Sequence, residues 1–421
     1  MNIKKLRKED TNLQQPSLGI QSLVEKTLGK LALEETARLI GVDVSDLVKA
    51  LEIAKSSDGY RHKKILKKRG KGYRRIDVPH KDLKWVQRAC HINLLLRHFK
   101  PTPICHSFVG RRFEKDSLHW IFGRSVISGA WAHLGVPPDE EPDPKSNSIN
   151  WRKPRSQLAI DFKDAFPSVS RTRIKEILQK LLEQTGKYQA GADIIAEILV
   201  DLTTWNGVLP QGAPTSPVLF NLACRDLDEI LIGEFSDEEQ KSRIKITRFC
   251  DDISVTRLSK KIGLKTRGKI ERLIHKNGFQ INEEKTVHWQ DSHHVLRINS
   301  INLDPINRRV FLPRETIERF RYLLYRSWQE LEESFSWWLV LGRDSDNTIK
   351  YFLNQAAYGR IAGIVGYCRM IYKEDSEMPL RLFSWNPDLS GYWDQERFEQ
   401  IFADISKGSL IQDLEDHLHY F

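Results

Sequence analysis

Two adjacent carboxylates, Asp251 and Asp252, lie between two short segments in which apolar and polar residues alternate. The alternation covers residues 244–249 before the pair, and Ile253 and Val255 continue it afterwards. A period of two is typical of a β-strand, so the pattern predicts a β-hairpin with both carboxylates at its tip. Side by side, two carboxylates repel each other, and a bound cation would relieve that repulsion.

A third carboxylate, Asp161, ends another strand-like segment, residues 158–161. Hard divalent cations such as Mg²⁺ prefer oxygen ligands, and a two-metal site for nucleotidyl transfer needs a few carboxylates that converge between strand ends. An isolated Asp-Asp pair is more often a solvated turn. The metal-site interpretation therefore depends on the sequence around these acids.

The segment between the acids is a loop rich in Gly and Pro, residues 209–217, followed by a helical pattern at 218–231. We expect Ser216 to be the N-cap of this helix and Pro217 its first residue. Backbone N–H groups at such a helix start suit contacts with a nucleotide or a template. Further along, Lys285 follows a strand-like run that Gly278 opens.

In the order acid, Gly-Pro loop, acid pair and lysine, these segments resemble the palm motifs of the reverse transcriptase family, and more narrowly of its bacterial retron-type branch. The four palm-like segments are residues 161–166, 209–217, 249–252 and 282–286. Towards the N-terminus, further segments resemble the fingers motifs and the stretch that retron-type enzymes carry before the first palm strand: residues 71–79, 83–87, 106–110, 117 and 129–133.

The sequence departs from the family pattern at three places. Phe249-Cys250 replace the commonest Tyr-Ala of the third palm motif, Gly129 replaces the Asn of Asn-Ala-x-x-His, and residues 298–300 read Ile-Asn-Ser in place of Val-Thr-Gly. We expect reverse transcription to be little affected. The departures leave open whether the protein belongs to a retron or is a related defence-type reverse transcriptase.

The resemblance implies an α+β, right-hand polymerase fold with fingers, an RRM-like palm (an antiparallel sheet packed on helices) and a helical thumb. We expect an N-terminal helical extension at 1–60, fingers at 61–156 with an acidic, Pro-rich insertion at 137–150, the catalytic palm at 157–304, and a helical thumb and C-terminal region at 305–421. Helices are expected at 314–325, 334–341 and 351–372.

The resemblance also implies roles for the candidate catalytic residues. Asp161, Asp251 and the carbonyl of Phe162 would hold two Mg²⁺ ions. Asp252 would be an auxiliary ligand, with a turn residue satisfied by backbone N–H groups as the alternative. Lys285 would donate a proton to the leaving pyrophosphate.

Three further residues are expected beside the dNTP substrate. Phe166 fits an aromatic gate that rejects a ribose 2′-OH, with a core phenylalanine as the alternative. Gln211 and Gly212 would lie by the template base and the incoming nucleotide, where glycine permits a close backbone approach. Cys250 is small enough to pack against the primer end.

Positive charge is concentrated in one part of the chain. The protein has 66 Lys and Arg against 56 Asp and Glu, a net charge of +10, and residues 61–75 contain nine Lys or Arg and no acid. Basic runs are usually solvated faces, but this one lies where fingers would close over a triphosphate. Lys68, Arg69 or Lys71 could meet phosphate as point charges, and Arg74 could bind it in a bidentate manner.

The retron-type resemblance implies an RNA-directed DNA polymerase that uses a cognate structured non-coding RNA as template and primer and leaves branched RNA joined to single-stranded DNA. The implied context is antiphage defence with a separate effector protein, and oligomerisation stays open. Two alternatives remain: a defence or abortive-infection reverse transcriptase that primes on protein or polymerises without a template, and a catalytically silent RNA-binding scaffold.

Composition excludes some other classes of protein. No stretch approaches the roughly 18 consecutive apolar residues of a membrane span, and residues 1–10 lack the apolar core of a secretory signal. We therefore expect no membrane partner and a cytoplasmic location in a bacterium. The five cysteines form no CxxC pair, so we expect free thiols and no zinc site.

Overall fold

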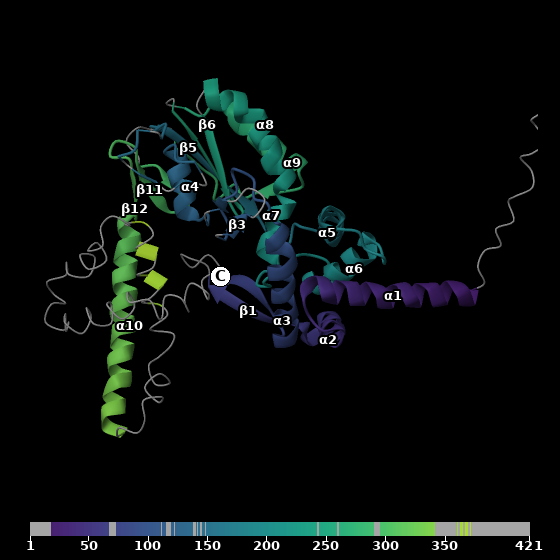
Figure 1. Ribbon diagram of the computed structural model, residues 1–421. Helices are drawn as coiled ribbons and strands as arrows, with labels where there is room; N and C mark the ends of the chain where they lie inside the picture. Colours follow the sequence, from purple (N-terminus) through teal and green to yellow (C-terminus); the bar gives the residue numbers. More distant parts are fainter. Residues whose placement is uncertain are drawn as a thin grey trace, which may run out of the picture. The chain divides into compact units, whose positions relative to one another are not determined.

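The computed structural model describes residues 18–66, 73–110, 112–114, 119–121, 123–137, 140, 142–143, 145–147, 149–241, 244–258, 261–289, 295–341, 360, 363–364, 367–368 and 371 (Figure 1). These residues belong to two compact units. The first unit comprises Met1–Lys100 and Asp164–Arg225, and the second comprises Pro101–Lys163 and Asp226–Phe421.

The first unit is mainly helical and contains one hairpin. Its elements are α1 (Leu18–Ile40), α2 (Val44–Lys55), β1 (Tyr60–Leu66), β2 (Tyr73–Pro79), α3 (Lys81–Cys90), a π-helical stretch (His91–Leu96), α5 (Arg171–Thr185), α6 (Ala192–Thr203) and α7 (Ser216–Ala223). Strands β1 and β2 pair antiparallel over their full length, from Tyr60 opposite Pro79 to Leu66 opposite Tyr73. Helices α1 and α2 lie within the segment 1–60 for which a helical extension is predicted, and residues 1–17 of that segment lie outside the described residues.

Helical periodicity explains how the first unit builds its core. Helix α5 buries Ile174, Leu178, Leu181 and Leu182, which lie on one face because they are spaced three or four residues apart. Helix α6 packs against that face with its own apolar residues. A buried side chain, Gln87 of α3, donates hydrogen bonds to the Tyr60 hydroxyl and to a carbonyl of α6, both at 2.8 Å.

The second unit contains an antiparallel sheet in the order β6-β7-β5-β8, with β9 also paired to β5. The strands are β5 (Ser156–Lys163), β6 (Ile244–Phe249), β7 (Asp252–Arg257), β8 (Gln280–Ile281) and β9 (Val287–Trp289). Strands β6 and β7 form the hairpin that the alternating sequence predicts. Three helices lie beside this sheet: α4 (Val126–His133), α8 (Arg225–Lys241) and α9 (Leu264–Lys276) (Figure 1). Helix α8 begins at Arg225, the last residue of the first unit.

A buried histidine joins a helix to this sheet. The His133 ring of α4 forms hydrogen bonds with the hydroxyls of Thr256 (2.7 Å) and Thr247 (2.8 Å), one on each strand of the β6-β7 hairpin. Burial lowers the pKa of His133 well below its usual value, so the ring is neutral. It therefore donates through one nitrogen and accepts through the other.

The remaining elements of the second unit are β3 (Arg112–Glu114), β4 (His119–Ile121), β10 (Arg297–Ile298), β11 (Ile301–Asp304), β12 (Arg309–Phe311) and α10 (Arg314–Leu341). Strands β10, β11 and β12 form a small sheet of their own. Its apolar residues share a core with α4 and with the first part of α10, including Ile127, Ile298, Val310 and Leu324.

The structure corrects three details of the expected helices. Thr215, not Ser216, occupies the N-cap position of α7, and the Ser216 hydroxyl instead donates to the Pro210 carbonyl at 2.7 Å. The helical pattern at 218–231 is divided between α7 and α8. Helix α10 runs unbroken from Arg314 to Leu341 because no Gly or Pro interrupts it, whereas the sequence predicts two helices there.

Other expectations have mixed outcomes. All five cysteines are free thiols, as predicted, and the structure shows that all five are buried. Most of the helix expected at 351–372 lies outside the described residues. The division into N-terminal extension, fingers, palm and thumb stays a prediction. None of the helices in the described part of the chain combines the length and the hydrophobicity that a membrane span requires.

Candidate active site

Three carboxylates of the second unit lie where adjacent strands begin or end. Asp161 on β5 is directly opposite Asp252, the first residue of β7. Asp251 precedes it in the turn of the β6-β7 hairpin, and its carbonyl accepts a hydrogen bond from the Phe162 amide at 3.0 Å. The hairpin thus carries the acid pair to β5, and residues about ninety positions apart in the chain become neighbours.

The electrostatics of this cluster favour a cation. Burial, followed by the charge of Asp161, raises the pKa of Asp251 above its usual value. Burial, followed by the charges of Asp251 and Asp161, raises the pKa of Asp252 to about 7. Carboxyl groups that are both poorly solvated and close together resist full ionisation, so a cation that neutralised them would bind strongly.

Lys285 supplies one positive charge to the cluster. Its Nζ donates to both carboxylate oxygens of Asp161, at 2.8 and 2.9 Å. The local fold accounts for this contact: β8 pairs with β5, the Asn282 amide donates to the Asp161 carbonyl at 2.8 Å, and a turn follows that returns Lys285 to β5. Lys285 is about half exposed, whereas Asp161 is largely buried.

The donor set fits Mg²⁺. Carboxylate oxygens are the ligands that this ion prefers, and it is usually held by one or two carboxylates together with substrate phosphates. As the side chains stand, no three Asp, Glu, His or Cys residues in the described part of the chain are placed together to hold a metal ion. Asp161, Asp251 and Asp252 are the residues that would bind the ion.

The predicted nucleotide contacts belong to the first unit. Phe166 is partly buried, and its ring packs against Phe220, with centroids 5.2 Å apart. The Gln211 carbonyl accepts a hydrogen bond from the Asp77 amide at 2.7 Å. Gly212 has φ +132°, and a Cβ there would lie 2.8 Å from the Asp77 carbonyl oxygen. The loop therefore passes so close to β2 that only glycine fits.

The basic segment of the first unit is only partly described. Arg74 lies on β2 opposite Ile65 and is exposed. Lys68, Arg69 and Lys71 lie outside the described residues. The neighbouring Arg75 is paired with an acid, because its Nε donates to Asp77 at 2.8 Å.

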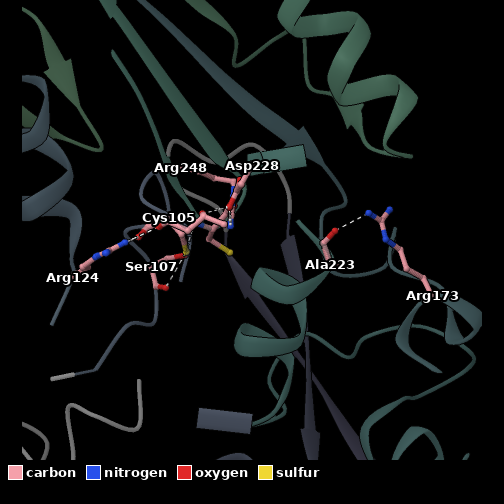
Figure 2. A network of polar contacts seen from close by, with 9 residues as sticks. Cys105, Ser107, Arg124, Arg173, Ala223, Asp228 and Arg248 are labelled. Carbon is pink, nitrogen blue, oxygen red and sulfur yellow. Dashed lines mark hydrogen bonds and ion pairs between the residues drawn. The ribbon is translucent and has the colours of Figure 1, made fainter. Parts of the chain in front are cut away.

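Sequence reasoning missed a buried ion pair in the second unit. Arg248 of β6 and Asp228 of α8 are fully buried, and they are joined by two hydrogen bonds of 2.7 Å, from Nε to Oδ1 and from Nη2 to Oδ2 (Figure 2). A signal was available. Arg248 occupies the same face of its strand as Ile244 and Ile246, and a charge at an inward position of a buried strand requires a partner.

Comparisons with known proteins identify the family of this chain. A family model described as reverse transcriptase (RNA-dependent DNA polymerase) matches residues 65–300, more than half of the chain. The retron Mx65 reverse transcriptase of Myxococcus xanthus is 27% identical over 305 residues, which cover 70% of this chain and 62% of that protein. The retron Ec86 reverse transcriptase of Escherichia coli is 31% identical over 163 residues, covering 39% of this chain and 42% of that protein. The chain thus spans roughly half the length of these relatives.

Solved structures of telomerase are also similar, though more distantly. Telomerase from Candida tropicalis in complex with the TWJ fragment of telomeric RNA has a TM-score of 0.37 and 14% identity, covering 75% of this chain and 55% of that one. The apo telomerase of the same organism has a TM-score of 0.38 and 12% identity, covering 83% and 62%. From the match of the family model, the chain belongs to the reverse transcriptase (RNA-dependent DNA polymerase) family, and it is similar to retron-type members of that family.

Proposed function

We propose that this protein is an RNA-directed DNA polymerase of the retron type, which copies a cognate structured RNA into single-stranded DNA. The observation that carries this function is the cluster of Asp161, Asp251 and Asp252 at adjoining strand ends, with Lys285 bonded to the first of them. The same cluster lies within the segment that the reverse transcriptase family model matches.

The proposed chemistry is nucleotidyl transfer. Mg²⁺, when bound, supplies the positive charge that activates a primer hydroxyl and neutralises a triphosphate. Asp161, Asp251 and the Phe162 carbonyl would hold two such ions, and Asp252 would assist them. Lys285 Nζ would leave Asp161 and donate a proton to the leaving pyrophosphate, a general acid contribution of about 10²-fold or more.

Substrate binding is assigned to the first unit. Arg74, with Lys68, Arg69 or Lys71, would meet the triphosphate, and Phe166 would exclude a ribose 2′-OH. Gln211 and Gly212 would lie by the template base and the incoming nucleotide. The exposed basic strands β1 and β2 support this assignment, because phosphate binding requires accessible cations.

The RNA partner and the cellular role belong to the same proposal. The similar proteins are named retron reverse transcriptases, which supports reverse transcription of the retron type. The proposal adds a structured RNA as both template and primer, a branched RNA-DNA product, and a place in antiphage defence beside a separate effector protein. Recognition of that RNA would depend on its shape and 2′-hydroxyls more than on its sequence.

The nucleic acid that co-purifies with the full chain tests this function. Portions of the extract are digested in parallel with RNase and with DNase, and the DNA is sequenced. We expect one short DNA of fixed sequence joined to RNA, and we expect RNA without DNA from the Asp251→Ala, Asp252→Ala double variant. DNA in the double variant, or RNA alone in both proteins, would contradict the proposal. DNA joined to protein, or DNA of random sequence, would favour protein-primed or template-independent synthesis.

A further inference from the structure

The turn that carries Asp251 rests on the buried Asp228–Arg248 ion pair. Arg248 is the last residue but one of β6, and its guanidinium binds both carboxylate oxygens of Asp228 through Nε and Nη2. Its third nitrogen, Nη1, donates to the carbonyl of Cys250 at 3.0 Å. The planar guanidinium of one side chain therefore connects helix α8 to the residue that precedes Asp251.

The other polar group of the Cys250 backbone is also held by a side chain. Its N–H donates to the hydroxyl of Ser107 at 2.8 Å, and both residues are buried. Cys250 has φ +57°, in the left-handed region that residues with a side chain adopt uncommonly. Such a conformation persists where the surroundings determine it, and here Arg248 and Ser107 do so from either side.

The ion pair is itself held by further hydrogen bonds. The Thr102 hydroxyl donates to Asp228 Oδ2 at 2.7 Å. Arg124 Nη1 donates to the carbonyls of Thr102 (2.7 Å) and Cys105 (3.0 Å), so it holds the backbone of the segment 102–105 in place. The hydrogen bond from Thr102 thus orients the Asp228 carboxylate independently of its contact with Arg248.

The backbone of residues 104–106 runs alongside the end of β6. The Arg248 amide donates to the Ile104 carbonyl at 2.6 Å, and the His106 amide donates to the Arg248 carbonyl at 2.8 Å. These bonds add a short parallel bridge to the sheet beside the hairpin turn. The backbone of β6 is therefore held next to the turn that carries Asp251.

Stability alone does not account for this arrangement. A buried ion pair is often no more stabilising than apolar side chains of similar volume, because both charges lose their hydration. Apolar side chains, however, could not direct hydrogen bonds to the Cys250 peptide. The charged pair therefore contributes a fixed geometry of the turn, which apolar side chains would not provide.

We propose that Asp228, Arg248 and Ser107 are positioning residues, which fix the Cys250 peptide so that the Asp251 carboxylate is oriented to bind a divalent cation. This deepens the proposed function and rests on it for the kinetic effect. The effect on cation binding can be measured separately from polymerisation.

An apolar replacement of the pair separates positioning from stability. The Asp228→Leu, Arg248→Met double variant leaves no unpaired buried charge, so we expect it to fold, with a melting temperature lowered only by the lost hydrogen bonds to the Thr102 hydroxyl and the Cys250 carbonyl. Mn²⁺ binding to the full chain, measured by electron paramagnetic resonance, should weaken by about tenfold or more, as is typical when residues that orient metal ligands are lost. In primer extension, kcat should fall by about 10²-fold while KM for the nucleotide stays near the wild-type value.

Ser107→Ala provides a milder variant, and Thr203→Val provides a matched control. Thr203 is a buried residue of α6 in the first unit, and its hydroxyl donates to the Leu199 carbonyl at 2.7 Å. Both substitutions remove one buried hydroxyl. Ser107→Ala should weaken Mn²⁺ binding and lower kcat, whereas Thr203→Val should change only the melting temperature.

Wild-type Mn²⁺ affinity in the double variant would overturn the inference, and so would a Ser107→Ala protein that matches Thr203→Val in both measurements. If the double variant aggregates, the Ser107→Ala comparison decides. If the wild type binds Mn²⁺ in an Asp251-dependent manner but makes no DNA, the proposed function fails and the binding measurements still decide on positioning. Mn²⁺ binding that is unchanged in Asp251→Asn would overturn the inference as well.

Discussion

The hairpin β1-β2 of the first unit and the hairpin β6-β7 of the second differ in nearly every physical respect. The first is exposed and basic towards its turn, where Ile65, Tyr73 and Arg74 face solvent, and it is buried only at its base, at Tyr60 and Pro79. The second is buried along both strands, and its turn carries two acids. Both are antiparallel and regular in register.

The comparison shows that charge needs different support at the surface and in the interior. Exposed cations keep their hydration, so the β1-β2 hairpin needs few specific partners to carry its charge. Buried carboxylates need counter-ions and a fixed backbone: here Lys285 donates to Asp161, and Arg248 and Ser107 hold the peptide groups of the residue before Asp251. We therefore expect substitutions in the buried hairpin to act on chemistry, and those in the exposed hairpin to act on substrate affinity.

Removal of one buried charge should give the largest effect. Asp161→Asn keeps the size of the side chain but loses a ligand charge, so DNA synthesis in single-turnover primer extension should fall to the limit of detection. Asp164→Asn is the matched control. Asp164 is an exposed acid with φ +47°, a conformation that Asn also tolerates, and its variant should keep activity. Equal activity in the two variants would contradict the assigned site.

Lys285 is expected to contribute less, because it assists a step that the acids make possible. Lys285→Ala should lower kcat by about 10²-fold with little change in KM for the nucleotide. Lys276→Ala, which removes another lysine of the same unit, should leave kcat unchanged. A large increase in KM without loss of kcat would show that Lys285 binds the nucleotide and does not act as an acid.

Phe166→Ala should change selectivity more than rate. Without the ring, a ribose 2′-OH would no longer meet a steric barrier, so the ratio of kcat/KM for a dNTP to that for the matching rNTP should fall markedly. Primer extension with each nucleotide measures this ratio. Phe220→Leu alters the ring that packs against Phe166 and controls for general loosening. Unchanged discrimination in Phe166→Ala would show that the residue serves only to pack the first unit.

The sequence was sufficient to predict the β6-β7 hairpin, because strict alternation specifies a strand and two adjacent acids are suited to a turn. It also predicted the strand that carries Asp161 and a strand-like run before Lys285, of which Gln280–Ile281 forms β8. It did not reveal the Asp228–Arg248 pair, because a single charge in an apolar pattern shows that a partner is needed but not which residue supplies it. Asp228 lies twenty positions away, on another element.

Helix boundaries failed for a different reason. Thr215 and Ser216 are both good capping residues, and local propensity does not distinguish them. The tertiary contact from Ser216 to the Pro210 carbonyl decides the outcome. Gly212 also shows where the sequence stops being informative. The Gly-Pro loop predicts that its backbone closely approaches another group, but only the structure shows that β2 is one such group.

The raised pKa of Asp252 predicts that the stability of the protein depends on pH. The usual pKa is 3.8 and the folded value is about 7, so between these pH values the folded state keeps a proton that the unfolded state has lost. The stabilisation is complete below about pH 4 and is lost as the pH rises through about 7. Asp252→Asn should therefore raise the melting temperature of the metal-free protein at about pH 8 but not at about pH 4, as calorimetry in EDTA can show.

Mg²⁺ should reverse this loss, because it neutralises the carboxylates that the higher pH ionises. Wild-type protein should gain more thermal stability from Mg²⁺ at about pH 8 than at about pH 6, and Asp252→Asn should show a smaller difference. An equal gain at both pH values in the wild type would mean that Asp252 does not sense the ion.

The smallest effect is expected from Arg74 in the exposed hairpin. Arg74→Ala should raise KM for the nucleotide by a few-fold, and Arg74→Lys should restore part of the affinity because the charge returns without the bidentate geometry. The difference between wild type and Arg74→Ala should shrink at high salt, since exposed charges are screened. Loss of kcat at constant KM would instead place Arg74 beside the reacting groups, and the contrast between the two hairpins would no longer hold.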